Sequence, residues 1–146
     1  MSDVEVSIRI VAPPATVFRY FIDPDRMKQW IGVSAELEPQ PGGKFRVNVS
    51  GIDFAVGEYV EVTAPERIVW TWGWEGSATI PPGSSTVEVT LTADGDGTVV
   101  RLRHSGLPGT DAQDEHRKGW THYVSRLAIA GAGGDPGPDP ELKTTR

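Results

Sequence analysis

The chain of 146 residues contains no cysteine. This absence excludes disulfide bonds, thiolate nucleophiles and zinc sites with cysteine ligands. Basic residues are also scarce, because 14 Lys and Arg stand against 20 Asp and Glu and the formal net charge is -6. No run of basic residues interrupts that balance. A positive surface for phosphate backbones is therefore not expected, and the sequence predicts no nucleic-acid partner.

Long apolar runs are missing as well. No stretch approaches the length that crosses a membrane, and Asp3 and Glu5 stand where a signal peptide would carry basic and apolar residues. The sequence therefore predicts no membrane insertion and, because no targeting signal is found, a cytoplasmic location. The hydrophobic fraction of 38% is ordinary for a folded protein. We expect a single domain at residues 1–130 and a flexible tail, rich in glycine and proline, at residues 131–146.

The N-terminal part predicts one strand and two short helices. Apolar and polar residues alternate from Val4 to Ile10, which is the period of a strand with one buried face. Helical spacing then begins at Pro14, since proline is tolerated in the first turn of a helix. Asp23 and Pro24 favour the capped start of a second short helix.

The rest of the chain alternates with period two and then becomes helical. Turn residues separate six further candidate strands, at residues 35–38, 44–50, 54–63, 67–74, 86–92 and 98–105. From Asp111 to Ala130, apolar residues recur at the spacing of an amphipathic helix that should lie against the sheet. The order of elements predicts an α+β fold with a mainly antiparallel sheet.

Motifs for metal or cofactor chemistry are not found. His116 and His122 are six residues apart, so they do not form the i, i+4 pair of a helical metal site. The glycines at residues 131–134 follow a helix, whereas a dinucleotide-binding loop joins a strand to a helix. We therefore expect neither a metal nor a cofactor.

Two side chains are candidates for proton transfer. His104 shares a strand face with Val100 and Leu102, so it points inward either as a histidine satisfied by its neighbours or as a general base. Glu58 points inward if Val56 and Val60 face the core, and toward solvent if a bulge intervenes. No partner that would orient His104 is identifiable, and the sequence favours binding over catalysis.

Three tryptophans share one face of the segment at residues 67–74. Strand alternation places Trp70, Trp72 and Trp74 on that face. They either fill the core or line a half-open cavity, in which an indole presents an apolar wall and a hydrogen-bond donor. Trp74 is near the strand end and is expected at the rim.

Several segments, taken in order, resemble a known family. They are VAPPATVFRYFIDPDRMKQW (11–30), PGGKF (41–45), APERIVWTWGW (64–74), GTVVRLRHSGL (97–107) and GWTHYVSRL (119–127). The chain resembles the helix-grip, or SRPBCC, superfamily, which includes START domains, the birch-pollen allergen and polyketide cyclases. Within it, the chain is most similar to the family named after the activator of the heat-shock-protein-90 ATPase and its C-terminal domain.

The resemblance implies a sheet of about seven antiparallel strands curved around a long C-terminal helix, with an apolar cavity between them. By position, it implies that the cavity wall includes Trp30, Phe45, Val47, Trp70, Trp72, Leu102, His104, Trp120 and Tyr123. One position departs from the family, because Ser105 replaces an acidic residue that members often have after this histidine.

The expected function is the binding of an apolar, aromatic or lipid-like small molecule in that cavity. Two alternatives stay open: an enzyme of the cyclase or hydratase type that uses the same cavity, and a protein-interaction module of the co-chaperone kind. A homodimer through a sheet edge is also left open.

Overall fold

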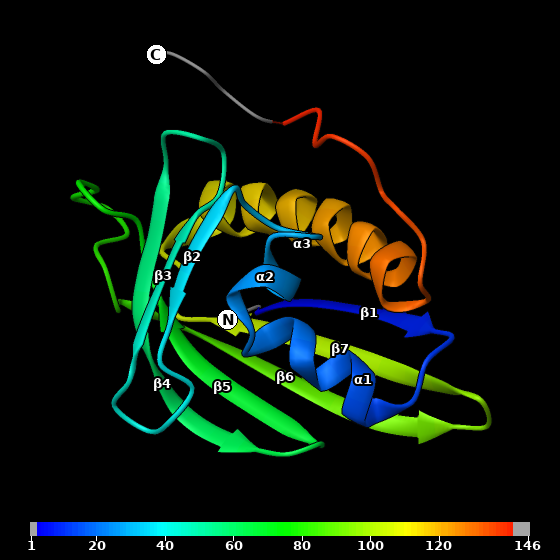
Figure 1. The fold of residues 1–146 in the computed structure, drawn as a ribbon. Coiled ribbons are helices and arrows are strands. Elements are labelled where there is room, and N and C mark those ends of the chain that lie inside the picture. Colours follow the sequence, from blue (N-terminus) through cyan, green and yellow to red (C-terminus); the bar gives the residue numbers. More distant parts are fainter. Residues whose placement is uncertain (1–2, 142–146) are drawn as a thin grey trace.

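The computed structural model describes residues 3–141, which form a curved antiparallel sheet gripping one long helix (Figure 1). The strands are β1 (Val4–Ile10), β2 (Ser34–Leu37), β3 (Lys44–Asn48), β4 (Phe54–Thr63), β5 (Arg67–Trp72), β6 (Ser85–Asp94) and β7 (Gly97–Ser105). The helices are α1 (Pro14–Phe18), the 3₁₀ turn η1 (Arg19–Phe21), α2 (Pro24–Met27) and α3 (Gly109–Gly131).

The seven strands form one sheet in the order β1-β7-β6-β5-β4-β3-β2, with antiparallel neighbours throughout. The helix-grip architecture implied by the resemblance is therefore confirmed. The boundaries differ from the predicted ones by a few residues, as at β5, which ends at Trp72 and leaves Trp74 in an isolated bridge with Ala55.

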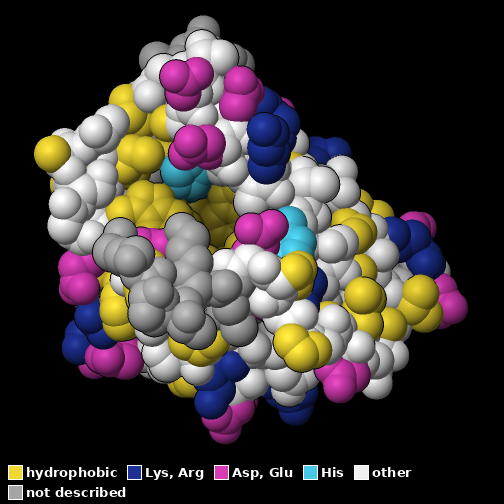
Figure 2. Space-filling model, turned by 90° about the horizontal axis from the view of Figure 1, so that it is seen from above, with side chains coloured by type: hydrophobic (Ala, Val, Ile, Leu, Met, Phe, Trp, Pro, Cys, Tyr) yellow, Lys and Arg dark blue, Asp and Glu magenta, His cyan; other side chains and the backbone are white. Residues whose placement is uncertain are grey.

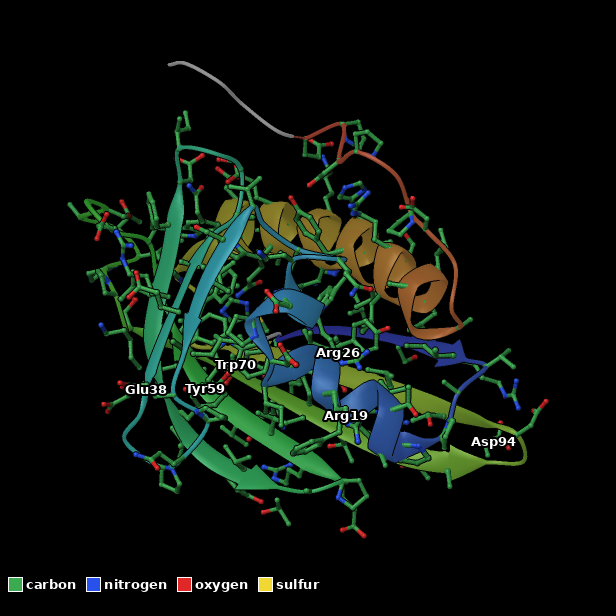
Figure 3. The ribbon with its side chains drawn as sticks, in the orientation of Figure 1. Arg19, Arg26, Glu38, Tyr59, Trp70 and Asp94 are labelled. Atoms are coloured by element: carbon green, nitrogen blue, oxygen red, sulfur yellow. The ribbon has the colours of Figure 1, made fainter. Side chains whose placement is uncertain are left out.

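The short helices follow from local chemistry. Pro14 opens α1, and Asp23 caps α2 by accepting a hydrogen bond from the backbone N–H of Asp25 at 2.9 Å. Their buried residues pack on the concave face of the sheet, where Figure 3 places Trp70 and Tyr59 close to these helices. Aromatic rings dominate this part of the core, since Phe45 stacks on Trp70 and Phe21 lies against both Trp30 and Trp70.

A register shift in β4 decides which of its side chains face inward. Ala55 and Tyr59 are buried, whereas Glu58 and Val60 are exposed, and the irregularity lies between Tyr59 and Glu61. Glu58 and Val60 therefore share an outward face, whereas Val62, beyond the irregularity, packs against the core. The alternative for Glu58, a position toward solvent, is the one observed.

The segment after α3 returns along the helix (Figure 1). The buried guanidinium of Arg126 donates hydrogen bonds to the carbonyls of Trp30, Pro136 and Gly137. Residues 136 and 137 therefore contact the folded domain, although the division into domain and tail stays a prediction. The end of the predicted tail, residues 142–146, lies outside the described residues.

Candidate ligand-binding site

A pocket of about 220 Å³ opens between the N-terminal half of α3 and the end of β5. Three indole rings form much of its wall, because Trp72 comes from β5, Trp74 follows it, and Trp120 contacts Trp72 from α3. The ring centroids of Trp72 lie 5.0 Å from Trp120 and 5.3 Å from Trp74. We call this space the inner pocket; it is lined by Ile31, Val49, Trp72, Trp74, Glu115, His116, Gly119, Trp120 and Tyr123.

The inner pocket is continuous with a wider and more polar groove of about 650 Å³. Both spaces are lined by Trp74, Glu115, Gly119 and Tyr123. We call the wider space the outer groove; its other lining residues are Ser50, Asp53, Phe54, Glu75, Gly76, Ser77, Lys118, His122 and Glu141. Figure 2 shows hydrophobic side chains recessed in a hollow, with charged and histidine side chains around it.

His104 is fully buried behind the inner pocket, and both of its ring nitrogens are engaged. Trp120 donates its indole N–H to Nδ1 at 2.9 Å. The hydroxyl of Ser85 donates to the carbonyl of Trp72 at 2.8 Å, so its oxygen accepts the Nε2–H of His104, also at 2.8 Å. Burial and the neighbouring His116 lower the pKa of His104 to about 3. The ring is therefore neutral and held in one tautomer.

His116 repeats this arrangement at the wall of the inner pocket. Its Nε2 accepts the indole N–H of Trp74 at 3.0 Å, which leaves the proton on Nδ1 to be donated to the carbonyl of Ala112 at 2.8 Å. Burial lowers the pKa of His116, while the bond to Ala112 and the charge of Glu115 oppose this shift. Two neutral imidazoles, 5.2 Å apart between the ring centroids of His104 and His116, thus accept two indole donors.

Two other indoles differ, because the Nε1 atoms of Trp70 and Trp72 are buried and have no hydrogen-bond partner among residues 3–141. Trp70 lies within the closed aromatic core, whereas Trp72 lines the inner pocket although only 3% of it is exposed. An unpaired buried donor is uncommon in folded proteins and calls for an explanation.

The carboxylate of Asp139 joins the C-terminal segment to two residues of α3 that line the outer groove. The Tyr123 hydroxyl donates to Asp139 at 2.8 Å, and His122 Nε2 lies 2.8 Å from the other carboxylate oxygen. Burial raises the pKa of Asp139, but hydrogen bonds from the Glu141 N–H, His122 and Tyr123 outweigh it and lower that pKa overall. The hydroxyl of Tyr123 is thereby fixed away from the inner pocket.

The predicted wall residues separate into two groups. Trp72, Trp120 and Tyr123 line the inner pocket. The other predicted residues lie in the closed core beside it, each at most 1% exposed: Trp30, Phe45, Val47, Trp70, Leu102 and His104. Of the two candidates for proton transfer, Glu58 is exposed on the outer side of β4.

Sequence reasoning missed several pocket residues. His116 precedes Trp120 by four residues and Tyr123 by seven, so it lies on the same face of the helix. Extending the apolar stripe of the helix by one turn would have found it. Val49 follows β3, and it continues the alternation of Phe45 and Val47 in the predicted strand at residues 44–50, so extending the predicted wall by two residues would have found it. Ile31 follows α2, where no strand alternation applies. Within residues 3–141, no helix is long and apolar enough to cross a membrane, and no group of His, Asp and Glu is arranged to hold a metal ion.

The sheet, the long helix and the pocket between them define a helix-grip domain of the SRPBCC superfamily. The sequence profile of the family described as Activator of Hsp90 ATPase homolog 1-like protein matches residues 11–131. The chain therefore belongs to that family. Among curated proteins, none matches the chain.

Solved structures agree with this assignment. An AHSA1-like protein from Rhizobium etli is 47% identical, with 95% of this chain and 87% of that one covered and a TM-score of 0.76. DynU16, a putative protein in the dynemicin biosynthetic locus, is 26% identical with a TM-score of 0.80; all of this chain (100%) aligns with 51% of that one. The Aha1 dimer from Colwellia psychrerythraea, 17% identical with 92% of this chain and 98% of that one covered, shares the fold with a TM-score of 0.80.

Proposed function

We propose that this protein binds a small apolar molecule that carries an aromatic ring, seated between α3 and the sheet. The observation that carries the proposal is the inner pocket itself, whose walls are the rings of Trp72, Trp74 and Trp120. Such a concave, mostly apolar space with a polar border is typical of small-molecule sites.

The size of the space limits the ligand. A dry engineered cavity of roughly 150 Å³ accepts benzene. The inner pocket, at about 220 Å³, has room for one or two fused rings, and the outer groove would hold substituents. Burial of such a ring, after the costs of association, would give a dissociation constant on the order of micromolar.

The hydrogen bonds of the two buried histidines support binding over proton transfer. A general base needs a free nitrogen within reach of the substrate. In His104, Nδ1 accepts from Trp120 and Nε2 donates to Ser85, and both nitrogens of His116 are engaged as well. The cyclase or hydratase alternative with His104 as the base is therefore not favoured. The co-chaperone-like module, the homodimer and the cytoplasmic location stay predictions.

Gly119 offers a direct test of binding. It lines both spaces from the middle of α3, and a Cβ atom there would meet no heavy atom within 4 Å. Gly119→Leu should fill the inner pocket and abolish binding of a neutral probe such as naphthylethanol, measured by titration calorimetry.

The matched control is Gly119→Ala, which adds one carbon and should keep most of the binding. Both variants should be at least as stable as the wild type, because glycine inside a helix costs about 1 kcal/mol relative to alanine. Equal probe affinity in the wild type and in Gly119→Leu would contradict the proposed site, as would a wild type that binds no aromatic probe.

A further inference from the structure

The charged side chains that line the outer groove are mostly acidic. They comprise four carboxylates and one ammonium: Asp53, Glu75, Glu115, Glu141 and Lys118. The histidine of the groove, His122, is already engaged by Asp139. A groove lined mainly by one sign of charge favours a ligand group of the opposite sign.

These carboxylates differ in how far neighbouring groups already satisfy them. Glu75 forms an ion pair with Arg46 at 3.2 Å, and Asp53 accepts a hydrogen bond from the Ser50 hydroxyl at 2.8 Å. Glu115, by contrast, forms no ion pair within 4.0 Å in the described part of the chain. Among residues 3–141, no cation pairs with it; the same holds for Glu141, which lines the outer groove alone.

Glu115 also holds a special position, because it lines both the outer groove and the inner pocket. Lys118, which could attract an anion, lines the outer groove and not the inner pocket. The influence of Glu115 reaches the inner wall, since its charge favours the protonated form of His116 against the effect of burial. A charged group on a ring held in the inner pocket would meet Glu115 first.

The inner pocket has few donors to offer an anion. The indole N–H of Trp74 is used by His116, that of Trp120 by His104, and the Tyr123 hydroxyl by Asp139. The Nε1 of Trp72 is unpaired but buried. A ligand carboxylate would lose its hydration without replacement. A cation would meet a carboxylate and the faces of indole rings, which attract positive charge.

From these contacts we infer that the ligand is an arylalkyl amine in its cationic form, with its ring in the inner pocket and its ammonium group beside Glu115 and Trp74. This inference rests on the proposed function and specifies the charge of the ligand. It separates this pocket from one built for fatty acids or other anionic lipids, whose carboxylates need positive or hydrogen-bonding partners.

The experiment compares three compounds that share one ring and differ in charge: naphthylethylamine, naphthylethanol and naphthylpropionate. Their dissociation constants are measured by calorimetry with the full chain at neutral pH and low salt. The amine should bind about tenfold more tightly than the carboxylate, with the alcohol between them. The preference should shrink at about 1 M salt, where the screening length falls to roughly 3 Å.

Variants of Glu115 assign the preference to this side chain. Glu115→Gln should bring the affinity for the amine close to that for the alcohol, and Glu115→Lys should reverse the order of amine and carboxylate. Glu66→Gln is the matched control, because it removes the same charge from an exposed turn between β4 and β5, outside the lining of both spaces. It should leave all three affinities unchanged.

The outcomes separate the two proposals. If the alcohol binds and the carboxylate binds as tightly as the amine, the inference is overturned and the binding function stands. The inference is also overturned if the preference for the amine survives in Glu115→Gln. If none of the three compounds binds to the wild type, the proposed function fails.

Discussion

The two ends of the space between α3 and the sheet differ in which elements pack against the inward face of β5. At one end, Trp70 packs against Phe21 of η1 and Phe45 of β3, and the space is filled. At the other end, Trp72 meets Trp120 of α3 and borders the inner pocket. Trp70 and Trp72 are two residues apart on the inward face of β5, yet Trp70 belongs to the closed core and Trp72 to the open pocket. The covering element decides between them.

The largest expected effect is that of removing Trp120, which contacts Trp72 and His104 at the pocket end. Trp120→Ala should lower the free energy of unfolding by about 3–5 kcal/mol, because it removes a buried ring and leaves Nδ1 of His104 without a donor. Chemical denaturation monitored by circular dichroism measures this loss. Lys118→Ala, an exposed change on the same helix, should stay within about 0.5 kcal/mol of the wild type. A loss below about 1 kcal/mol for Trp120→Ala would contradict the described packing.

An intermediate effect concerns acid stability at the pocket end. Since burial lowers the pKa of His104 to about 3 in the folded state, the unfolded chain binds more protons at mildly acidic pH. The stabilisation is complete above the ordinary histidine value of 6.5 and is lost as the pH falls toward 3. For each such histidine, the free energy of unfolding should fall by up to about 1.4 kcal/mol per pH unit in this window.

The check is the free energy of unfolding of the wild type and of His104→Gln, measured between about pH 7 and pH 4.5. The variant should show a shallower dependence on pH, because one of the two buried histidines, His104 and His116, no longer titrates. Parallel curves would show that His104 is not buried in its neutral form.

The smallest expected effect is the difference in stability loss between two Trp→Phe variants, one from each end. The N–H of Trp70 is unpaired, so Trp70→Phe removes ring volume and no hydrogen bond. Trp120→Phe removes a similar volume and also leaves the Nδ1 of His104 unpaired, which should add about 1–3 kcal/mol to its cost. Thermal unfolding of the two variants gives the difference. Equal losses would mean that the bond from Trp120 to His104 contributes nothing to stability.

Much of the fold could be predicted from the sequence, because it depends on local patterns. Alternation located the strands, proline and Asp23 marked the short helices, and the i, i+3, i+4 pattern located α3. A bulge in β4 was one of two alternatives and could not be decided or located from the sequence, since it depends on the pairing of β4 with β5. The hydrogen bonds from Arg126 to the C-terminal segment could not be predicted either, because that segment has no periodic pattern that would indicate a contact with α3.

For the site, the sequence could predict only which side chains lie on the inward face of each strand. Alternation placed Trp70, Trp72 and His104 inward, and all three are buried. It could not say that η1 fills the space beside Trp70 while the pocket remains beside Trp72, because that depends on how helices far away in sequence pack on the sheet. The hydrogen-bond partners of His104 were missed for the same reason, as Ser85 and Trp120 reach it from β6 and α3.

The ligand site is tested most directly by following the five indole N–H signals in nitrogen–proton NMR spectra during titration with naphthylethylamine. The signals of Trp72, Trp74 and Trp120 should shift in a saturable way, because these rings line the inner pocket. The signals of Trp30 and Trp70, buried at the closed end, should stay in place. Shifts of equal size for all five indoles, or no saturable shift in any, would contradict a ligand site between α3 and the end of β5.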